Sequence, residues 1–560
     1  MSSQSLPVQE PALRVGSRLG RYGRLEAQVS AHPDLIASVL VGLGFCWRVW
    51  LAQATFFNTD EAWHYSVANQ SSPLAAYKAS LTLAHPPLMV FVLYFWRHLG
   101  TSNVMLRLPG VVAGTIFCWV FYKWLRILFG QTVALCGLIF AAFLPPMIAL
   151  SAEVRQYSWM LLFAASAAYF LERALDGNSA RMMLLSSVSF YLAMLSHYSA
   201  FLFAASLGIY AILRMLSRPP AAPVMASWGA GQMAGVGLAA FLYVTHVAKL
   251  GTVYPGEPLH RFADFYLSSW YFHPGRDSLE RFLWRGTFGV FRFTFGQTAL
   301  GQIAALLFVA GVILLIRQKP GSQDAHPRSA AVLLMVPFFL NWIAVAAGLY
   351  PYGRTRQCIF LAIFGLTGAS VALSSIARNH SFRAAALGVG IVAICQIFGT
   401  PQGRDMLPLD EQRHEHMERA LQFLRSQVSP NDLVFTDKAT AFQLGHYLCH
   451  QRPVQIEHLA EGFEFFRCDD MRVVASGPNE PALSGEDFVT RFEHMKGIYA
   501  LNSETTVWVV QGGWSSRLGE TLRGRVPEFS NLEIHFFGGY LEAFKLPSIS
   551  TSPTLAPPQR

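Results

Sequence analysis

Residues 34–65 read DLIASVLVGLGFCWRVWLAQATFFNTDEAWHY, an apolar run followed at once by a compact polar stretch. The apolar part, Asp34–Phe57, is long enough to cross a bilayer as a helix. The polar part follows directly and contains the acidic pair Asp60-Glu61 at the mouth of that helix. Carboxylates at a membrane boundary are costly unless they face water, a cation or a reacting group. The pair is therefore the first candidate for chemistry in this chain.

The composition predicts an α-helical polytopic membrane protein. Of 560 residues, 52% are hydrophobic and only 14% are charged, whereas soluble domains carry about 25% charged residues. The mean hydropathy is +0.33, and apolar blocks of about 20 residues recur along the chain. The net charge of +9 does not indicate nucleic-acid binding, because the Arg and Lys residues fall largely in short connections, where they set topology.

Basic residues at the ends of the apolar runs predict about eleven spans, with the N-terminus inside and the C-terminus outside. Pro86–Leu99 is too short for a hydrocarbon core of about 30 Å, so we expect it to lie in the outer interface. With that assignment, Glu153 and Arg155 fall on the same face as Asp60. The expected spans are 34–57, 107–128, 131–150, 157–175, 182–196, 198–216, 226–248, 299–316, 330–349, 357–376 and 384–398.

The chain divides by composition into four parts. We expect a cytoplasmic segment at 1–33, a transmembrane catalytic domain at 34–400 with outer loops 57–106 and 249–298, a small extracytoplasmic α/β domain at 401–547, and a disordered tail at 548–560. The loop 249–298 is rich in aromatic and charged residues, as expected of interfacial helices and a lid. Within the α/β domain, 410–427 predicts a helix, and 432–437, 505–510 and 532–537 predict strands. Cys449 and Cys468 can pair outside the cytoplasm, but the sequence leaves the pairing open.

Polar clusters converge on the outer face. Carboxylates there can act as a general base on a hydroxyl or hold a divalent cation, and interfacial arginines can bind a phosphate through two hydrogen bonds. This combination suits transfer from a phosphorylated lipid to a hydroxyl or amine. Each feature also has a simpler interpretation, such as a solvated loop pair, an ion pair that caps a span or an anchor to lipid head groups. The clusters are Asp60-Glu61, His85, Glu153 with Arg155 and Tyr157, and Arg354 with Arg356; His197 is a further possible member.

The order of these motifs resembles the GT-C integral-membrane glycosyltransferases. Within that superfamily it looks most like the branch with protein O-mannosyltransferases, lipid A aminoarabinose transferases and rhizobial galacturonosyl transferases. The resemblance covers roughly residues 34–400, with a similar outer domain behind it. The motifs are Asp60-Glu61, His85-Pro86-Pro87-Leu88, Arg107-Leu108-Pro109, Glu153-Val154-Arg155-Gln156-Tyr157 and Tyr350-Pro351-Tyr352-Gly353.

The resemblance implies an inverting displacement at the anomeric carbon of a polyprenyl-phosphate sugar. Asp60 is the expected base, although the sequence leaves open which of Asp60 and Glu61 takes that role. Glu61 and Glu153 would position the acceptor or bind a cation such as Mg, Mn or Zn. Some relatives carry Asp where this chain has Glu153 and Lys where it has His85, and either difference bears on metal use or donor choice. Asp60, Glu61 and Glu153 are the expected catalytic residues; Arg155, Arg354, Arg356, His85 and Tyr157 the expected phosphate ligands; and His197, His64 and Arg107 further possible site residues.

The expected setting is a bacterial inner membrane, among membrane lipids, with an envelope glycan, lipid or protein as acceptor. A transporter or lipid flippase is the main alternative. It would place ionisable residues near mid-span, whereas here they gather at one face. A membrane scaffold for envelope assembly is a third possibility.

Overall fold

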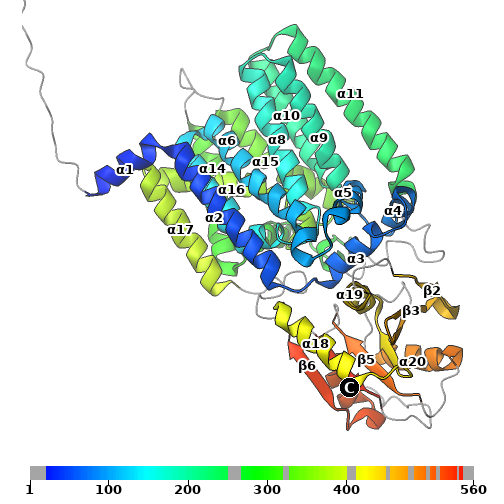
Figure 1. Cartoon of the computed structure of the whole chain (residues 1–560). Coiled ribbons are helices and arrows are strands. Elements are labelled where there is room, and N and C mark those ends of the chain that lie inside the picture. The colour runs from blue at the N-terminus through cyan, green and yellow to red at the C-terminus, as the bar shows by residue number, and fades with distance from the viewer. Residues whose placement is uncertain are drawn as a thin grey trace, which may run out of the picture.

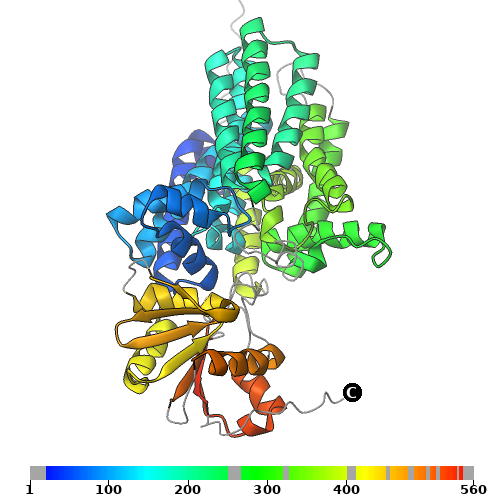
Figure 2. The same cartoon turned by 90° about the vertical axis from the view of Figure 1, so that its right-hand side faces the viewer.

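A computed structural model shows a helical membrane part joined to an α/β region (Figures 1 and 2). It describes residues 21–249, 267–318, 327–399, 412–449, 454–476, 485–499, 505–512, 517–538 and 541–546. The expected disordered tail, most of the expected cytoplasmic segment and part of the expected loop 249–298 lie outside these ranges.

The predicted helical membrane architecture is confirmed, and each predicted span coincides with a helix or with half of α6. Among the described residues, seven helices are long and apolar enough to cross a membrane: α2, α6, α10, α11, α14, α15 and α17. The helices of this part are α1 (Arg21–Ala31), α2 (Pro33–Ala54), α3 (Thr59–Ala68), α4 (Pro73–Ser80), α5 (Leu88–Trp96), η1 (Arg97–Leu99), α6 (Asn103–Phe143), α7 (Pro145–Ala149), α8 (Tyr157–Asp176), α9 (Ala180–Ser196), α10 (Ala200–Ser217), α11 (Ala222–Thr245), η2 (Val247–Lys249), η3 (Ser268–Trp270), α13 (Leu279–Phe295), α14 (Thr298–Arg317), α15 (Pro327–Ala346), η4 (Arg356–Cys358), α16 (Leu361–Ile376) and α17 (Ser381–Phe398).

Helix α6 is two helices that meet at Gly130. The backbone there has a φ of 80°, a left-handed value that glycine adopts without the strain a Cβ atom would bring. A Cβ atom on Gly137 would lie 2.3 Å from Leu125 and 3.3 Å from Phe121, so the second half packs closely against the first. The two predicted spans 107–128 and 131–150 are therefore the arms of one helical hairpin.

A buried arginine completes the end of this hairpin. Pro145 and Pro146 have no backbone N–H, so the carbonyl groups four residues earlier, in Ala141 and Ala142, cannot accept the usual helical bonds. Arg48 of α2 donates to both carbonyl oxygens, at 3.0 and 2.9 Å. The guanidinium thus supplies donors where no water reaches the backbone, as membrane-embedded structure requires.

The C-terminal region is a seven-stranded mixed sheet between two layers of helices. The strand order is β2-β3-β4-β1-β5-β7-β6, in which β1 runs parallel to β4 and β5 and the other pairs are antiparallel. Side chains alternate along β1: Val434 packs in the core with α18 and α19, and Phe435 packs in the core with α20 and α21. The elements are α18 (His414–Gln427), β1 (Leu433–Thr436), α19 (Lys438–Leu448), β2 (Glu457–His458), η7 (Ala460–Gly462), β3 (Glu464–Cys468), β4 (Met471–Ala475), α20 (Gly485–Tyr499), β5 (Val507–Gln511), α21 (Leu518–Arg525), η8 (Pro527–Phe529), β6 (Ile534–Gly538) and β7 (Leu541–Lys545).

The three predicted strands are present as β1, β5 and β6, with four more that the sequence analysis did not predict. This region lies at the end of the helical bundle where α3 is found, and α19 packs on α3 (Figures 1 and 2). The end of the helical bundle that contains α3 is therefore covered by the C-terminal region.

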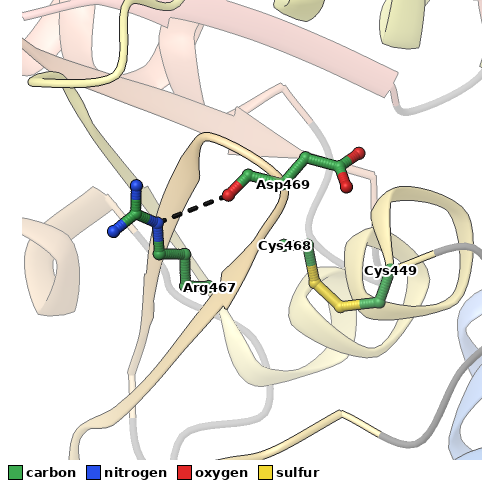
Figure 3. Close-up of a disulfide and its surroundings, with 4 residues drawn as sticks. All are labelled: Cys449, Arg467, Cys468 and Asp469. Atoms are coloured by element: carbon green, nitrogen blue, oxygen red, sulfur yellow. Dashed lines mark hydrogen bonds between the residues drawn. A yellow bond between two sulfur atoms is a disulfide. The ribbon is translucent and has the colours of Figure 1, made fainter.

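A disulfide joins Cys449, at the C-terminal end of α19, to Cys468, at the end of β3 (Figure 3). Beside it, Asp469 begins the tight turn into β4 with a φ of 52° and accepts a hydrogen bond from Arg467 at 3.3 Å. The disulfide thus ties α19, the helix that packs on α3, to β3 of the sheet.

We predict that replacing both cysteines, Cys449→Ser and Cys468→Ser, lowers the stability of the C-terminal region by about 3 kcal/mol. The physical reason is the closure of a short loop in the unfolded chain, across a separation of 19 residues. Thermal unfolding in detergent, with proteolysis of residues 412–546 as the readout, measures this. Cys46→Ser, at an exposed free cysteine of α2, is the control, and equal midpoints for all three proteins would contradict the prediction.

Candidate active site

The site begins at the N-terminus of α3. Asn58 caps this helix through a capping box: its side chain accepts from the Glu61 N–H at 3.0 Å, and Glu61 accepts from the Asn58 N–H at 3.0 Å. Asp60 and Glu61 thus lie in the first turn, where the helix dipole stabilises negative charge. The polar stretch that follows the first span is therefore a well-defined helix start.

Glu61 is buried and bound on both oxygens. Arg107 of α6 donates to Oε1 at 2.7 Å and to Oε2 at 2.6 Å, and the Val154 N–H donates to Oε1 at 2.9 Å. Arg107 also donates to the carbonyl oxygens of Ala52, Thr55 and Phe56, at 2.6–2.9 Å. These contacts favour a positioning role for both residues over proton transfer or metal binding.

Asp60 points instead to two other arginines. Arg155 lies 2.9 Å and Arg356 2.5 Å from its Oδ2 atom. The three residues come from α3, from the loop before α8 and from η4, far apart in the sequence. Burial opposes ionisation, but the two guanidinium groups outweigh it and hold the pKa of Asp60 below its usual value. Asp60 is therefore an anion between two cations, with 14% of its side chain exposed.

Glu153 is the second carboxylate of the site. Its Oε2 atom is buried, lies 3.7 Å from Arg356 Nη1 and makes no hydrogen bond with the described residues. Burial raises the pKa of Glu153 to about 7, against the attraction of Arg356. A carboxyl group in this state can gain or lose a proton near neutral pH.

A wall of rings borders the charged cluster. His85 lies between His64 and His197, with ring centroids 5.9 and 5.2 Å away, and Tyr157 packs 5.2 Å from His197. Arg155 lies 5.4 Å from the centre of the Tyr157 ring and donates to its hydroxyl at 3.3 Å. The structure thus brings all three predicted histidines and Tyr157 to the same place.

The histidines of this wall are neutral. Burial lowers the pKa of His64 and of His197 to about 3, and Arg155 adds to the effect in both. Burial and the neighbouring His197 hold the pKa of His85 well below its usual value. Buried Nε2 of His64 and Nδ1 of His85 have no hydrogen-bond partner among the described residues. These rings can therefore offer hydrogen bonds, but not charge, to a ligand.

Of the predicted arginines, Arg356 lies in the centre, with a buried side chain. Arg354, two residues earlier, has a partly exposed side chain. Its backbone runs close to α13, where a Cβ atom on Gly289 would approach its nitrogen to 2.9 Å. Arg155 and Arg356 are accordingly the stronger candidates for phosphate ligands.

The contacts of Glu61 do not suit the divalent cation that the sequence predicts for it. The part of the chain that the structure describes has no group of three His, Cys, Asp or Glu side chains placed to hold a metal. Both oxygens of Glu61 already accept hydrogen bonds, and the cation nearest to Glu153 is Arg356.

The sequence analysis did not predict the residues that hold the segment before α3. Phe57, which is fully buried, is contacted by Gln443, His446 and Tyr447 of α19. These contacts join positions about 390 residues apart, and no local pattern in the chain indicates them.

The crystal structure of ArnT from Cupriavidus metallidurans bound to undecaprenyl phosphate is similar to this one, with a TM-score of 0.51, 13% identity, and coverage of 95% of this chain and 100% of that chain. This chain has a GT-C-like fold. The resemblance inferred from the motifs is thereby confirmed at the level of fold.

The other matches cover part of the chain or have lower TM-scores. Residues 84–244 match the family model described as dolichyl-phosphate-mannose-protein mannosyltransferase. An Archaeoglobus fulgidus oligosaccharyltransferase tethered to an acceptor peptide gives a TM-score of 0.43 at 11% identity, over 85% of this chain and 68% of that one. Arabinosyltransferase EmbB from Mycobacterium smegmatis gives 0.35 at 14%, over 60% and 30%. No curated protein sequence matches the chain.

We predict that Arg107→Met lowers the stability of the protein by about 3–5 kcal/mol, because it leaves Glu61 charged and buried without a partner. Thermal unfolding in detergent measures the change. The double variant Arg107→Met/Glu61→Gln removes the stranded charge and should recover part of the loss. A single variant that melts like the wild type would show that the pair does not organise the site.

We predict a pH signature for Glu153. Its carboxyl titrates near 4.5 when unfolded and near 7 when folded, so the folded state binds more protons between these values. Stability attributable to this group therefore falls as the pH rises through that window, by up to about 3 kcal/mol. Glu153→Gln should flatten the difference in melting temperature between pH 5 and pH 8, and an unchanged slope would contradict the assignment.

Proposed function

We propose that this chain is a glycosyltransferase that moves a sugar from a polyprenyl-phosphate donor to an acceptor at the outer face of the membrane. The observation that carries the proposal is the convergence of Arg155 and Arg356 on one oxygen of Asp60. The cluster combines a proton acceptor with two guanidinium groups, which bind phosphate through paired hydrogen bonds. The GT-C fold, and the undecaprenyl phosphate bound to ArnT, support a lipid-linked donor.

In the proposed reaction Asp60 is the general base. The acceptor hydroxyl gives its proton to Asp60 while its oxygen forms a bond to the anomeric carbon. The bond from that carbon to the phosphate oxygen breaks, and its electron pair leaves on the polyprenyl phosphate. Attack opposite the leaving group inverts the anomeric configuration, and Arg155 and Arg356 stabilise the charge that develops on the phosphate.

Donor binding and base strength are coupled in this scheme. Both ion pairs of Asp60 end on Oδ2, so we assign the proton-accepting role to Oδ1. While both guanidinium groups hold the carboxylate, its pKa is low and it is a weak base. A donor phosphate that draws these groups toward itself weakens their hold, so Asp60 gains basicity when the donor is in place.

Glu153 is the second candidate for the base, because its pKa of about 7 suits proton transfer at neutral pH. With Asp60 as base, the Oε2 atom of Glu153, which makes no hydrogen bond with the described residues, accepts one from the acceptor. Glu61 lies next to Asp60 on α3 and accepts a hydrogen bond from Val154, the residue after Glu153, so it helps to position both carboxylates. His85 and His64 offer uncharged hydrogen bonds to the donor.

The proposed orientation places the N-terminus in the cytoplasm and the C-terminal region outside a bacterial inner membrane. The disulfide between Cys449 and Cys468 supports this, because such bonds persist in oxidising compartments. The acceptor is an envelope glycan, lipid or protein.

We predict that Asp60→Asn lowers turnover at least about a hundredfold, because the amide cannot accept the proton. Purified protein in lipid is incubated with a panel of polyprenyl-phosphate sugars, and release of polyprenyl phosphate is measured. Asp432→Asn, at an exposed turn of the C-terminal region, is the matched control.

The turnover of two variants separates the two candidate bases. If Asp60 is the base, Glu153→Gln keeps measurable turnover while Asp60→Asn loses it. The reverse pattern assigns the base to Glu153. Equal turnover by Asp60→Asn and the wild type would refute the role of Asp60, and substrate translocation without release of polyprenyl phosphate would favour a transporter.

A further inference from the structure

We infer that α19 of the C-terminal region is a positioning element of the active site, and that Tyr447 is its principal positioning residue. The inference rests on the proposed function, in which Asp60 is the base. It adds that the C-terminal region fixes where Asp60 lies, through the segment that leads into α3.

The first line of support is the hold of α19 on Phe57. The Phe57 N–H donates to the Tyr447 hydroxyl oxygen at 2.6 Å, and the Gln443 side chain donates to the Phe57 carbonyl at 3.2 Å. His446 stacks on the Phe57 ring, with centroids 4.4 Å apart. Both backbone polar groups of Phe57 and its ring are therefore bound by one helix, one residue before the cap of α3.

The second line is that the same helix holds the start of α6. The Tyr447 hydroxyl also accepts from the Asn103 side chain at 2.9 Å, and His446 Nε2 lies 3.0 Å from Asn103 Oδ1. Asn103 begins the helix that carries Arg107, the partner of Glu61. Tyr447 thus joins the start of α3 to the start of α6 through one oxygen atom.

Further contacts run along α3 and the segment before it. Phe442 of α19 stacks on Trp63 of α3, with centroids 5.8 Å apart and planes within 7°. The Phe56 N–H donates to the Gln412 carbonyl at 2.8 Å, and Thr55 forms an isolated β-bridge with Arg413. The C-terminal region therefore contacts residues 55–57 and Trp63, while Arg107 binds the carbonyl groups of Thr55 and Phe56.

Helix α19 is itself held firmly enough to act as a reference. Asp437 caps its N-terminus by accepting from the Thr440 N–H at 2.7 Å, and Lys438 forms a buried ion pair with Glu464 of β3. At the other end Cys449 is bonded to Cys468 of the same strand. Both ends of the helix are thus tied to β3, and its apolar face packs in the core of the sheet.

The chain of contacts explains how a distant layer affects Asp60. Asp60 lies three residues after Phe57, in the first turn of α3, so a shift of Phe57 moves Asp60 relative to Arg155 and Arg356, which belong to other segments. Small misplacements of a reacting group cost large factors in rate. The Tyr447 hydroxyl bonds to Phe57 and Asn103 rather than to Asp60 or the two arginines, so its role is positioning.

The test is Tyr447→Phe, which keeps the ring and removes the hydroxyl that binds Phe57 and Asn103. We expect faster hydrogen exchange in the peptide that covers residues 55–62, and about a tenfold or greater fall in kcat with little change in the KM for the donor. Tyr191→Phe is the matched control, because that hydroxyl donates to the Gly231 carbonyl at 2.6 Å between α9 and α11, away from α3. Equal melting temperatures of the two variants show that both are folded.

The outcomes test the positioning role of α19 separately from the proposed function. Faster exchange together with a lower kcat supports the inference. Unchanged exchange at residues 55–62 overturns it, and so does faster exchange with wild-type kcat, because the contact would then not position the base. If the wild type turns over no donor, the proposed function fails, and the exchange result alone decides whether α19 fixes the segment before α3.

Discussion

The buried ion pair between Glu61 and Arg107 joins the elements on which the site is built. The carboxylate receives the guanidinium on both oxygens and also the Val154 N–H, and the guanidinium donates to the carbonyl groups at the end of α2. A buried pair recovers the cost of its desolvation only when every remaining polar atom is satisfied. Here that condition fixes α2, α3, α6 and the loop before α8 relative to one another.

Neighbouring residues on a helix point in different directions, and this separates the roles of two adjacent carboxylates. Glu61 points into the protein and binds structural partners, whereas Asp60 points to Arg155 and Arg356. The same acidic pair therefore supplies an anchor and a candidate base. Next to them, Glu153 carries a raised pKa and Asp60 a lowered one, so the two outer carboxyl groups differ in protonation behaviour within one cluster.

The C-terminal region closes this arrangement from outside. Its helix α19 binds the segment before α3, and a disulfide and a buried ion pair hold the helix to its sheet. The charged cluster thus includes a residue of α3, the helix on which the C-terminal region packs. The neutral histidines beside it can offer hydrogen bonds to a ligand. They add no positive charge to that of Arg155 and Arg356.

The sequence by itself determined the membrane architecture, because apolar length and basic flanks report directly on transfer into a bilayer. It also indicated that Asp60, Glu153, Arg155 and Arg356 share one face of the membrane. The number of spans between two residues decides whether they lie on the same side. Four of the seven strands escaped prediction, because strands of two to five residues are too short to show a distinctive period. From the sequence, Asp60 and Glu61 were both candidates for the base, and their roles could not be told apart. Only the tertiary structure decided that Glu61 is engaged by Arg107, that Arg48 satisfies the carbonyl groups freed by Pro145 and Pro146, and that Tyr447 reaches Phe57. These contacts join residues far apart in the chain, so local patterns carry no record of them.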